Sequence, residues 1–197
     1  GIIVEIGEWV LTNACREMKH WIDAGLRPMR MAVNVSARQL RRRDFCETVA
    51  SALTASGLPA DLLELEITES IFISDSGHTL DILKGFKRLG VNLAMDDFGT
   101  GYSGLASLKH LPINKIKIDR SFIKNCKNNF LDQTIINTIS VLAHKLGITV
   151  VAEGVENETQ LNLLKEHDID NIQGYYFSRP LTAENCESYL KRSASKD

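Results

Sequence analysis

Hydrophobic positions along this chain follow two spacings in turn, and the alternation predicts helices and strands in succession. In some segments apolar residues recur every three or four positions, as in the series Trp9, Val10, Ala14, Met18 and Trp21, which is typical of an amphipathic helix. Between such segments lie short runs rich in Val, Ile and Leu, bounded by Gly, Pro or polar residues, which indicate strands. The predicted strands are 29–35, 62–67, 91–95, 113–118, 148–152 and 171–175, and the predicted helices are 6–22, 44–56, 75–89, 105–110, 131–146, 158–167 and 182–191.

Strands that alternate with helices predict repeated βαβ units, and therefore an α/β fold with a parallel sheet. A doubly wound sheet and a (β/α)8 barrel of the TIM type both fit this order, although a barrel needs two more strands than the pattern supplies. No linker or low-complexity segment interrupts the pattern. We expect one domain over residues 1–192, followed by a frayed tail at residues 193–197.

Composition narrows the class of protein and its partners. The chain has 197 residues, of which 24% are charged, and its formal net charge is -2, so nothing favours duplex nucleic acid or an anionic membrane as a partner. No apolar run is long enough to span a membrane. The four cysteines are far apart and form no CxxC pair, which argues against a zinc ribbon and fits reduced thiols. We therefore expect a cytoplasmic domain.

Polar residues stand at the C-terminal end of every predicted strand. They are Asn34, Glu66, Asp96 with Asp97, Lys117 with Asp119, Glu153, and Gln173. In a parallel sheet or barrel these strand ends share one face, which is where such folds keep their active sites. Each residue alone could be a helix cap or a loop hydrogen-bonding group, but so many carboxylates on one rim would repel one another unless a cation lay between them.

The types of these residues narrow the cation and the chemistry. Carboxylate and amide oxygens without clustered Cys or His favour Mg²⁺, Mn²⁺ or Ca²⁺. A pair of such cations suits phosphodiester hydrolysis, in which they stabilise the attacking and leaving oxygens. Lys117 would then neutralise charge on the phosphoryl group or help to position water. Alternatively, a lysine at a strand end could form a Schiff base, as in aldolases.

Six motifs, in this order along the chain, resemble those of the EAL domain, the cyclic di-GMP phosphodiesterase module of bacterial signalling proteins. They are Asn34-Val35-Ser36, Glu66-Ile67-Thr68-Glu69-Ser70, Asp96-Asp97-Phe98-Gly99-Thr100-Gly101-Tyr102-Ser103, Lys115-Ile116-Lys117-Ile118-Asp119, Val151-Ala152-Glu153-Gly154-Val155-Glu156 and Gln173-Gly174-Tyr175-Tyr176-Phe177. The resemblance covers nearly the whole chain. It implies a (β/α)8 barrel that binds two Mg²⁺ or Mn²⁺ ions and hydrolyses cyclic di-GMP to linear pGpG.

The resemblance also implies roles for individual residues. The metal ligands would be Asn34, Glu66, Asp96, Asp97, Asp119 and Glu153, and the catalytic residues would be Lys117 and Glu153. Gln173 and Glu156 would support the metal site or contact substrate, and Tyr175 is a candidate for stacking on guanine. Glu69 would brace the loop that contains Phe98, Gly99, Thr100, Gly101, Tyr102 and Ser103, where Gly104 replaces a usual serine.

One part of the family's pattern is missing from the chain. The Glu-Ala-Leu motif and a substrate-binding arginine would lie upstream of Gly1, so we expect a barrel that lacks about its first two strands. Loss of one ligand glutamate would weaken metal binding and lower the turnover of substrate by this chain. Unpaired edges at 29–35 and 171–175 predict a homodimer. A membrane would be contacted only through upstream domains, and a catalytically inactive cyclic di-GMP receptor is the alternative function.

Overall fold

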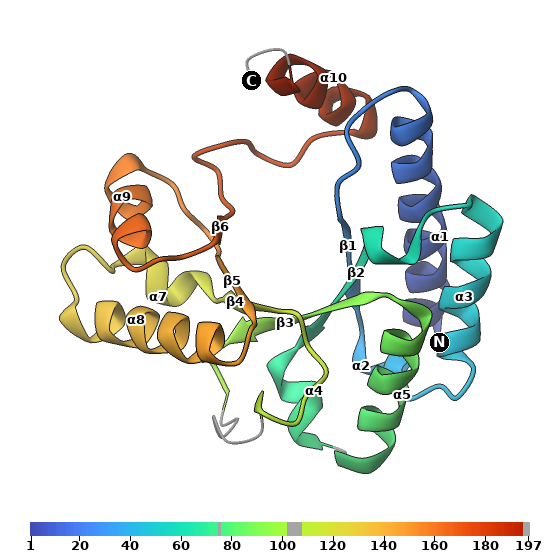
Figure 1. Cartoon of the computed structure of the whole chain (residues 1–197), viewed down its shortest axis with the longest axis horizontal. Coiled ribbons are helices and arrows are strands. Elements are labelled where there is room, and N and C mark those ends of the chain that lie inside the picture. The colour runs from blue at the N-terminus through green and yellow to red at the C-terminus, as the bar shows by residue number, and fades with distance from the viewer. Residues whose placement is uncertain (75, 102–107, 195–197) are drawn as a thin grey trace. The chain divides into compact units, whose positions relative to one another are not determined.

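The strands of this protein lie in one sheet in the order in which they occur along the chain. The structure, a computed structural model, describes residues 1–74, 76–101 and 108–194 (Figure 1). The sheet order is β1-β2-β3-β4-β5-β6, and the pairs from β3 to β6 are parallel. The strands are β1 (Met31–Val35), β2 (Leu63–Thr68), β3 (Asn92–Phe98), β4 (Lys115–Ile118), β5 (Thr149–Ala152) and β6 (Asn171–Ile172).

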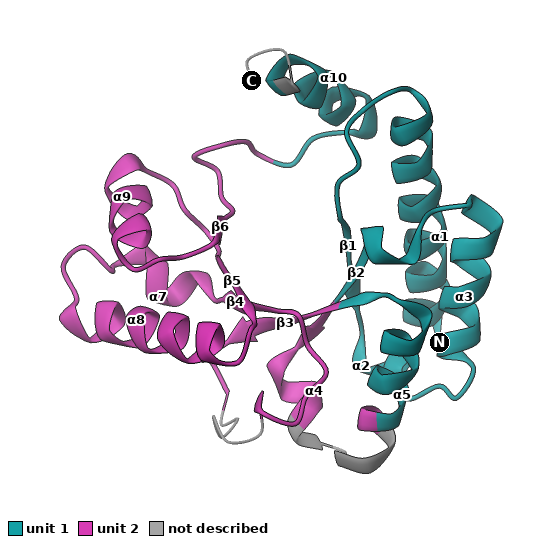
Figure 2. Ribbon diagram, in the orientation of Figure 1, with its two compact units in different colours: residues 1–65, 81–92, 180–197 teal, residues 66–80, 93–179 magenta. Residues whose placement is uncertain are grey.

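The chain divides into two compact units, which Figure 2 colours separately. The first comprises residues 1–65, 81–92 and 180–197, and the second comprises residues 66–80 and 93–179. Helices of the first unit are α1 (Ile2–Asp23), α2 (Ala37–Leu40), α3 (Phe45–Ser56), the 3-10 turn η1 (Ala60–Leu62), the greater part of α5 (Ser76–Leu89), and α10 (Ala183–Ala194). Helices of the second unit are α4 (Glu69–Ser74), α7 (Arg120–Lys124), α8 (Phe130–Lys145) and α9 (Glu158–Glu166).

The core of the first unit forms where α1 packs against α3. Leu11, Cys15 and Met18 lie on one face of α1 and are buried, as their helical spacing predicts. On α3, Phe45 is buried and meets the ring of Phe86 edge to face, with 5.6 Å between ring centroids. Burial of these side chains is the main stabilising contribution within this unit.

The core of the second unit forms between β4, β5 and α8. Ile116 and Ile118 of β4 and Val150 of β5 are fully buried, and α8 contacts β5. On α8 the buried residues Ile136 and Ala143 share the face that covers the strands. Lysines alternate with isoleucines along β4 (Lys115–Ile118). The Lys117 side chain therefore points to the opposite face of the sheet from Ile116 and Ile118.

The predicted strands and long helices are confirmed, with changes at their ends. β3 continues through both aspartates to Phe98, and β6 ends at Ile172, after which a turn follows in which Phe177 N–H donates to the Gly174 carbonyl at 3.1 Å. The helices α2, α4 and α7 are too short to give a periodic signal, and the sequence did not predict them. Residues 105–107 of the helix predicted at 105–110 lie outside the described residues. Of the described helices, none combines the length and the apolar character needed to cross a bilayer.

Candidate active site

Lys117 lies at the centre of a buried cluster of carboxylates in the second unit. Its ammonium group contacts Glu66 at 2.7 Å, Asp96 at 3.0 Å and Glu153 at 2.6 Å. These residues come from β2, β3, β4 and the residue after β5, so four neighbouring strands place them at their C-terminal ends. Only 5% of the Lys117 side chain is exposed. Four of the polar residues that the sequence places at strand ends therefore lie together.

The charge state of Lys117 follows from these contacts. Burial lowers the pKa of Lys117, but hydrogen bonds to Glu153 and Glu66 and the charges of both carboxylates raise it more, so the net shift is upward. Burial raises the pKa of Glu153, and the neighbouring Lys117 opposes that shift. Lys117 therefore carries a proton at neutral pH.

Asp96 and Asp97 are adjacent, yet a change in strand register lets both lie at the site. The pairing of β3 with β4 shifts between Met95 and Phe98, which is a bulge or similar irregularity. Asp97 has a φ of 55°, a left-handed conformation that Asp tolerates better than most residues. The carbonyl of Asp97 accepts hydrogen bonds from Thr100 Oγ1 at 2.8 Å and from Thr100 N–H at 3.3 Å, which hold the turn. The sequence had indicated a strand that ends before the aspartates, so this bulge is a finding of the structure.

Three carboxylates of the cluster are close enough to share one cation. Oxygen atoms of Asp96, Asp97 and Glu153 all lie within 4.8 Å of one another. Burial raises the pKa of Asp97, and the charges of Asp96 and Asp119 add to this rise, against the opposing effect of Lys117. A set of oxygen donors that repel one another fits a hard divalent cation such as Mg²⁺, Mn²⁺ or Ca²⁺.

Glu69 holds the chain immediately after the two aspartates. Its carboxylate accepts hydrogen bonds from Gly99 N–H at 2.9 Å and from Gly101 N–H at 3.3 Å, and the residue is 2% exposed. A Cβ at Gly101 would lie 2.9 Å from Glu69 Oε1, so a larger residue would push the carboxylate away. Glu69 thereby fixes the start of the loop. The positions of Tyr102 and Ser103, predicted in the same loop, lie outside the described residues.

A pocket of about 670 Å³ adjoins the cluster within the second unit. Predicted residues that line it are Asp119, Glu153, Glu156, Gln173 and Tyr175. Asp119 also caps α7, because its carboxylate accepts a hydrogen bond from Ser121 N–H at 2.9 Å. Asn34 lies on β1 in the first unit and is exposed.

Three residues with polar side chains also line this pocket and were not selected by the sequence analysis. They are Arg120, Ser121 and Lys124, all on α7. These residues directly follow Asp119 in the sequence. The four-residue spacing of Arg120 and Lys124 places them on one helix face, but only once a helix is known to begin there.

The fold and the site together define a class of protein: a parallel α/β domain with an oxygen-rich cluster at its C-terminal strand ends. The EAL domain family matches residues 1–180. The chain belongs to the EAL domain family. Its six strands are therefore part of the TIM-type (β/α)8 barrel of EAL domains, and the fold predicted from the sequence is confirmed.

Relatives and solved structures agree with this assignment. The chain is 42% identical over 191 residues to the cyclic di-GMP phosphodiesterase NbdA of Pseudomonas aeruginosa, covering 97% of the chain and 24% of NbdA. It superposes with a TM-score of 0.91 and 41% identity on the PaMucR phosphodiesterase in a c-di-GMP complex, covering 94% of this chain and 75% of that one. MucR is also a protein of Pseudomonas aeruginosa.

A structure that contains a metal is also similar. The manganese/cy-diGMP complex of Klebsiella pneumoniae BlrP1 matches with a TM-score of 0.84 and 29% identity, covering 91% of this chain and 45% of BlrP1. BlrP1 has also been solved as a calcium/cy-diGMP complex. The chain spans about a quarter of the length of the curated relatives that it matches.

Proposed function

We propose that this domain is a metal-dependent phosphodiesterase that hydrolyses cyclic di-GMP to linear pGpG. The observation that carries the proposal is the cluster itself, in which the Lys117 ammonium and the oxygens of Asp96, Asp97 and Glu153 lie together at the ends of parallel strands. Support also comes from the phosphodiesterase relatives and from the c-di-GMP and manganese complexes of similar structures.

Asp96, Asp97 and Glu153 are the residues that we assign to the metal, with Glu66, Asp119 and Asn34 as further ligands by their place in the family motifs. We propose two Mg²⁺ or Mn²⁺ ions in the complete site. Divalent cations at such a site activate water and stabilise the attacking and leaving oxygens of a phosphodiester. Gln173 and Glu156 would support this site or contact substrate from the pocket wall.

Lys117 has two roles in this proposal. It holds Glu66, Asp96 and Glu153 in fixed positions through short ion pairs, which preorganises the donors before substrate binds. Its positive charge also favours the transition state, in which negative charge builds up on the phosphoryl oxygens. Because its pKa is raised, Lys117 keeps its proton and cannot be the general base. Glu153, which contacts Lys117 and lies beside both aspartates, is the group that we assign to proton transfer.

Hydrolysis breaks one bond between phosphorus and a 3′ oxygen, and the attacking water supplies the new oxygen of the 5′ phosphate. The 3′ oxygen takes up a proton, and the cyclic dinucleotide becomes linear pGpG. In this step Glu153 would accept a proton from the entering water, while Lys117 would offset the charge of the phosphoryl group.

Chromatographic detection of pGpG from cyclic di-GMP, in Mn²⁺ or Mg²⁺ and in EDTA, tests this function. Wild type should release pGpG only with metal, and Asp96→Asn and Glu153→Gln should each reduce the rate by about 100-fold or more, as removal of a key electrostatic group does. Lys165→Ala, an exposed change on α9, is the matched control. Tight nucleotide binding without any pGpG would indicate a receptor instead of an enzyme.

We further propose that residues 1–192 act as one domain, that it works as a homodimer, and that it acts in the cytoplasm. The proposed substrate supports the location, because cyclic di-GMP is an intracellular second messenger of bacteria. The edge positions of β1 and β6 in the sheet support self-association. Any membrane attachment would involve parts of a longer protein.

A further inference from the structure

The pocket beside the carboxylate cluster has one positively charged wall, formed by α7. Arg120 and Lys124 both line the pocket and stand four residues apart on this helix, a spacing that places their side chains on one face. Both side chains are exposed, and among the described residues no carboxylate lies within ion-pair distance of either one. Ser121 also lines the pocket, and its hydroxyl group is a further hydrogen-bond donor there.

The backbone fixes the base of this wall. Gly154 has a φ of 72°, and a Cβ placed there would lie only 2.6 Å from the Cβ of Arg120. The start of α7 is therefore packed tightly against the residue that follows Glu153. Asp119 lines the pocket and also caps α7, so a residue of the site holds the start of this helix.

The remaining charged groups of the pocket are negative. Asp119, Glu153 and Glu156 line it, and the cluster cation Lys117 is held within 3.0 Å of three carboxylates. A cyclic dinucleotide carries two phosphodiester groups, each with one negative charge, and only one of them is cleaved. The second phosphate would be repelled by the carboxylates unless separate cations faced it.

We propose that Arg120 and Lys124 form an anion subsite for the phosphate that is not cleaved. This inference rests on the proposed function, because it assigns the second half of the same substrate. Arg and Lys are the residues best suited to phosphate, since the guanidinium group offers paired donors and the ammonium group offers a compact charge. The subsite positions the substrate, while the cluster around Lys117 acts on the reacting phosphorus.

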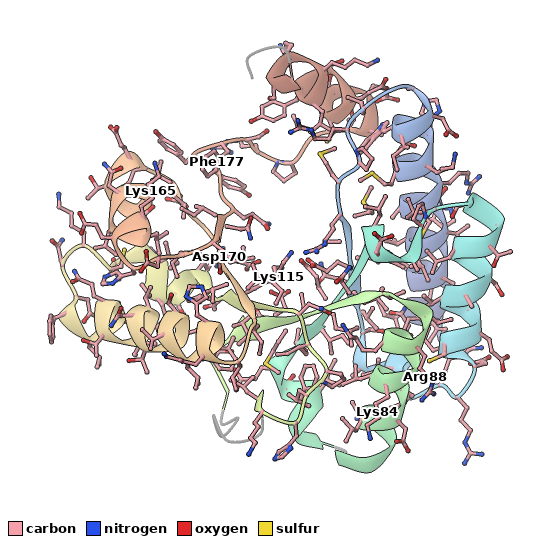
Figure 3. All side chains as sticks on the ribbon, viewed as in Figure 1. Lys84, Arg88, Lys115, Lys165, Asp170 and Phe177 are labelled. Atoms are coloured by element: carbon pink, nitrogen blue, oxygen red, sulfur yellow. The ribbon has the colours of Figure 1, made fainter. Side chains whose placement is uncertain are left out.

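Calorimetric titration with cyclic di-GMP in Ca²⁺ tests the subsite by binding alone, since a calcium/cy-diGMP complex exists for the similar BlrP1. Arg120→Ala and Lys124→Ala should each raise Kd about tenfold, which corresponds to the loss of one hydrogen bond to a charged group. The rise of Kd with salt concentration should be less steep in each variant, because one screened charge–charge attraction to the phosphate is lost. Arg120→Lys should recover part of the affinity, and Lys165→Ala, on α9 (Figure 3), should bind as wild type does.

The outcomes separate this inference from the proposed function. If wild type binds and cleaves the nucleotide while Arg120→Ala and Lys124→Ala match it in Kd, the subsite is wrong and the function stands. A raised Kd with an unchanged salt slope would assign the two residues to the base, and would also overturn the phosphate subsite. Binding that weakens as predicted, without cleavage in Mn²⁺, would support the subsite and reject the enzyme. If wild type fails to bind the nucleotide, both proposals fall together.

Discussion

At the scale of single residues, the central feature is one lysine that three carboxylates share, those of Glu66 and Asp96 buried and that of Glu153 half-buried. The sequence predicted that Lys117, Glu66, Asp96 and Glu153 would lie on one rim, because each stands at a strand end. It could not predict the direct ion pairs, since the partners of Lys117 are 51, 21 and 36 positions away along the chain and their contacts depend on strand register. The left-handed backbone of Asp97 was equally invisible, because neither composition nor periodicity reports a φ angle.

Replacing Lys117 should reveal how strongly the cluster depends on its charge. Lys117→Met removes the ammonium from buried carboxylates, which should lower the free energy of unfolding by about 3 kcal/mol or more in EDTA. Mn²⁺ should return more stability to this variant than to wild type, because a bound cation replaces the missing charge. Urea unfolding with and without metal measures both effects, with Lys165→Met as the surface control. Equal stability of variant and wild type in EDTA would contradict this account.

At the scale of elements, the loop after β3 and the strand β5 are each held by one acidic side chain from elsewhere in the second unit. Glu69 precedes the loop by about thirty positions, and Asp170 follows β5 by about twenty. The family resemblance predicted the Glu69 contact, whereas nothing in the sequence predicted that of Asp170. The Asp170 contact could not be predicted because nothing in the sequence distinguishes an exposed aspartate next to a strand from other loop residues.

Glu69→Ala should loosen the loop and reduce turnover. The Gly99 and Gly101 N–H groups would lose their acceptor, which should cost about 1–3 kcal/mol in the free energy of unfolding. The cleavage rate should fall by more than stability alone explains, because Asp97 lies next to the released segment. Glu69→Gln retains one acceptor oxygen and should lie between wild type and Glu69→Ala. An alanine variant that cleaves at the wild-type rate would refute the bracing role.

Asp170 should make stability depend on pH in acid. Burial raises the pKa of this carboxyl, but hydrogen bonds from Val150 N–H and from His144 lower it more, so its pKa in the folded state is below 3.8. A depressed pKa contributes stability that is complete above the unfolded value and is lost as the pH falls through the folded one.

Thermal or urea unfolding should therefore find Asp170→Asn about 1 kcal/mol less stable than wild type at pH 7, a modest value because the side chain is partly exposed. The difference should shrink as the pH falls below about 4. Asp168→Asn, an exposed change two residues away, should show no such dependence. A difference that grows in acid would contradict the assigned direction.

At the scale of the whole molecule, the alternation of strands and helices was enough to predict the fold class. The six strands are present in chain order, because long apolar runs and helical periodicity survive without tertiary information. Pattern alone did not choose between a doubly wound sheet and a barrel. The short helices α4 and α7 were missed because they have too few residues to show a period.

Strand order also predicts self-association. β1 and β6 are at the two ends of the sheet order, and edge strands invite pairing with another chain. Light scattering at high protein concentration should give a mass of about 44 kDa, twice the 22.0 kDa of one chain. A mass of one chain throughout the concentration range would contradict the predicted homodimer.

We propose that the cluster around Lys117 carries out metal-dependent hydrolysis of a phosphodiester. The most direct measurement is cleavage of cyclic di-GMP in water labelled with ¹⁸O, followed by mass spectrometry, in Mn²⁺ and in EDTA. We expect pGpG with one labelled oxygen in its 5′ phosphate in Mn²⁺, and intact nucleotide in EDTA. Intact nucleotide after prolonged incubation of the protein with Mn²⁺, or pGpG without the label, would contradict it.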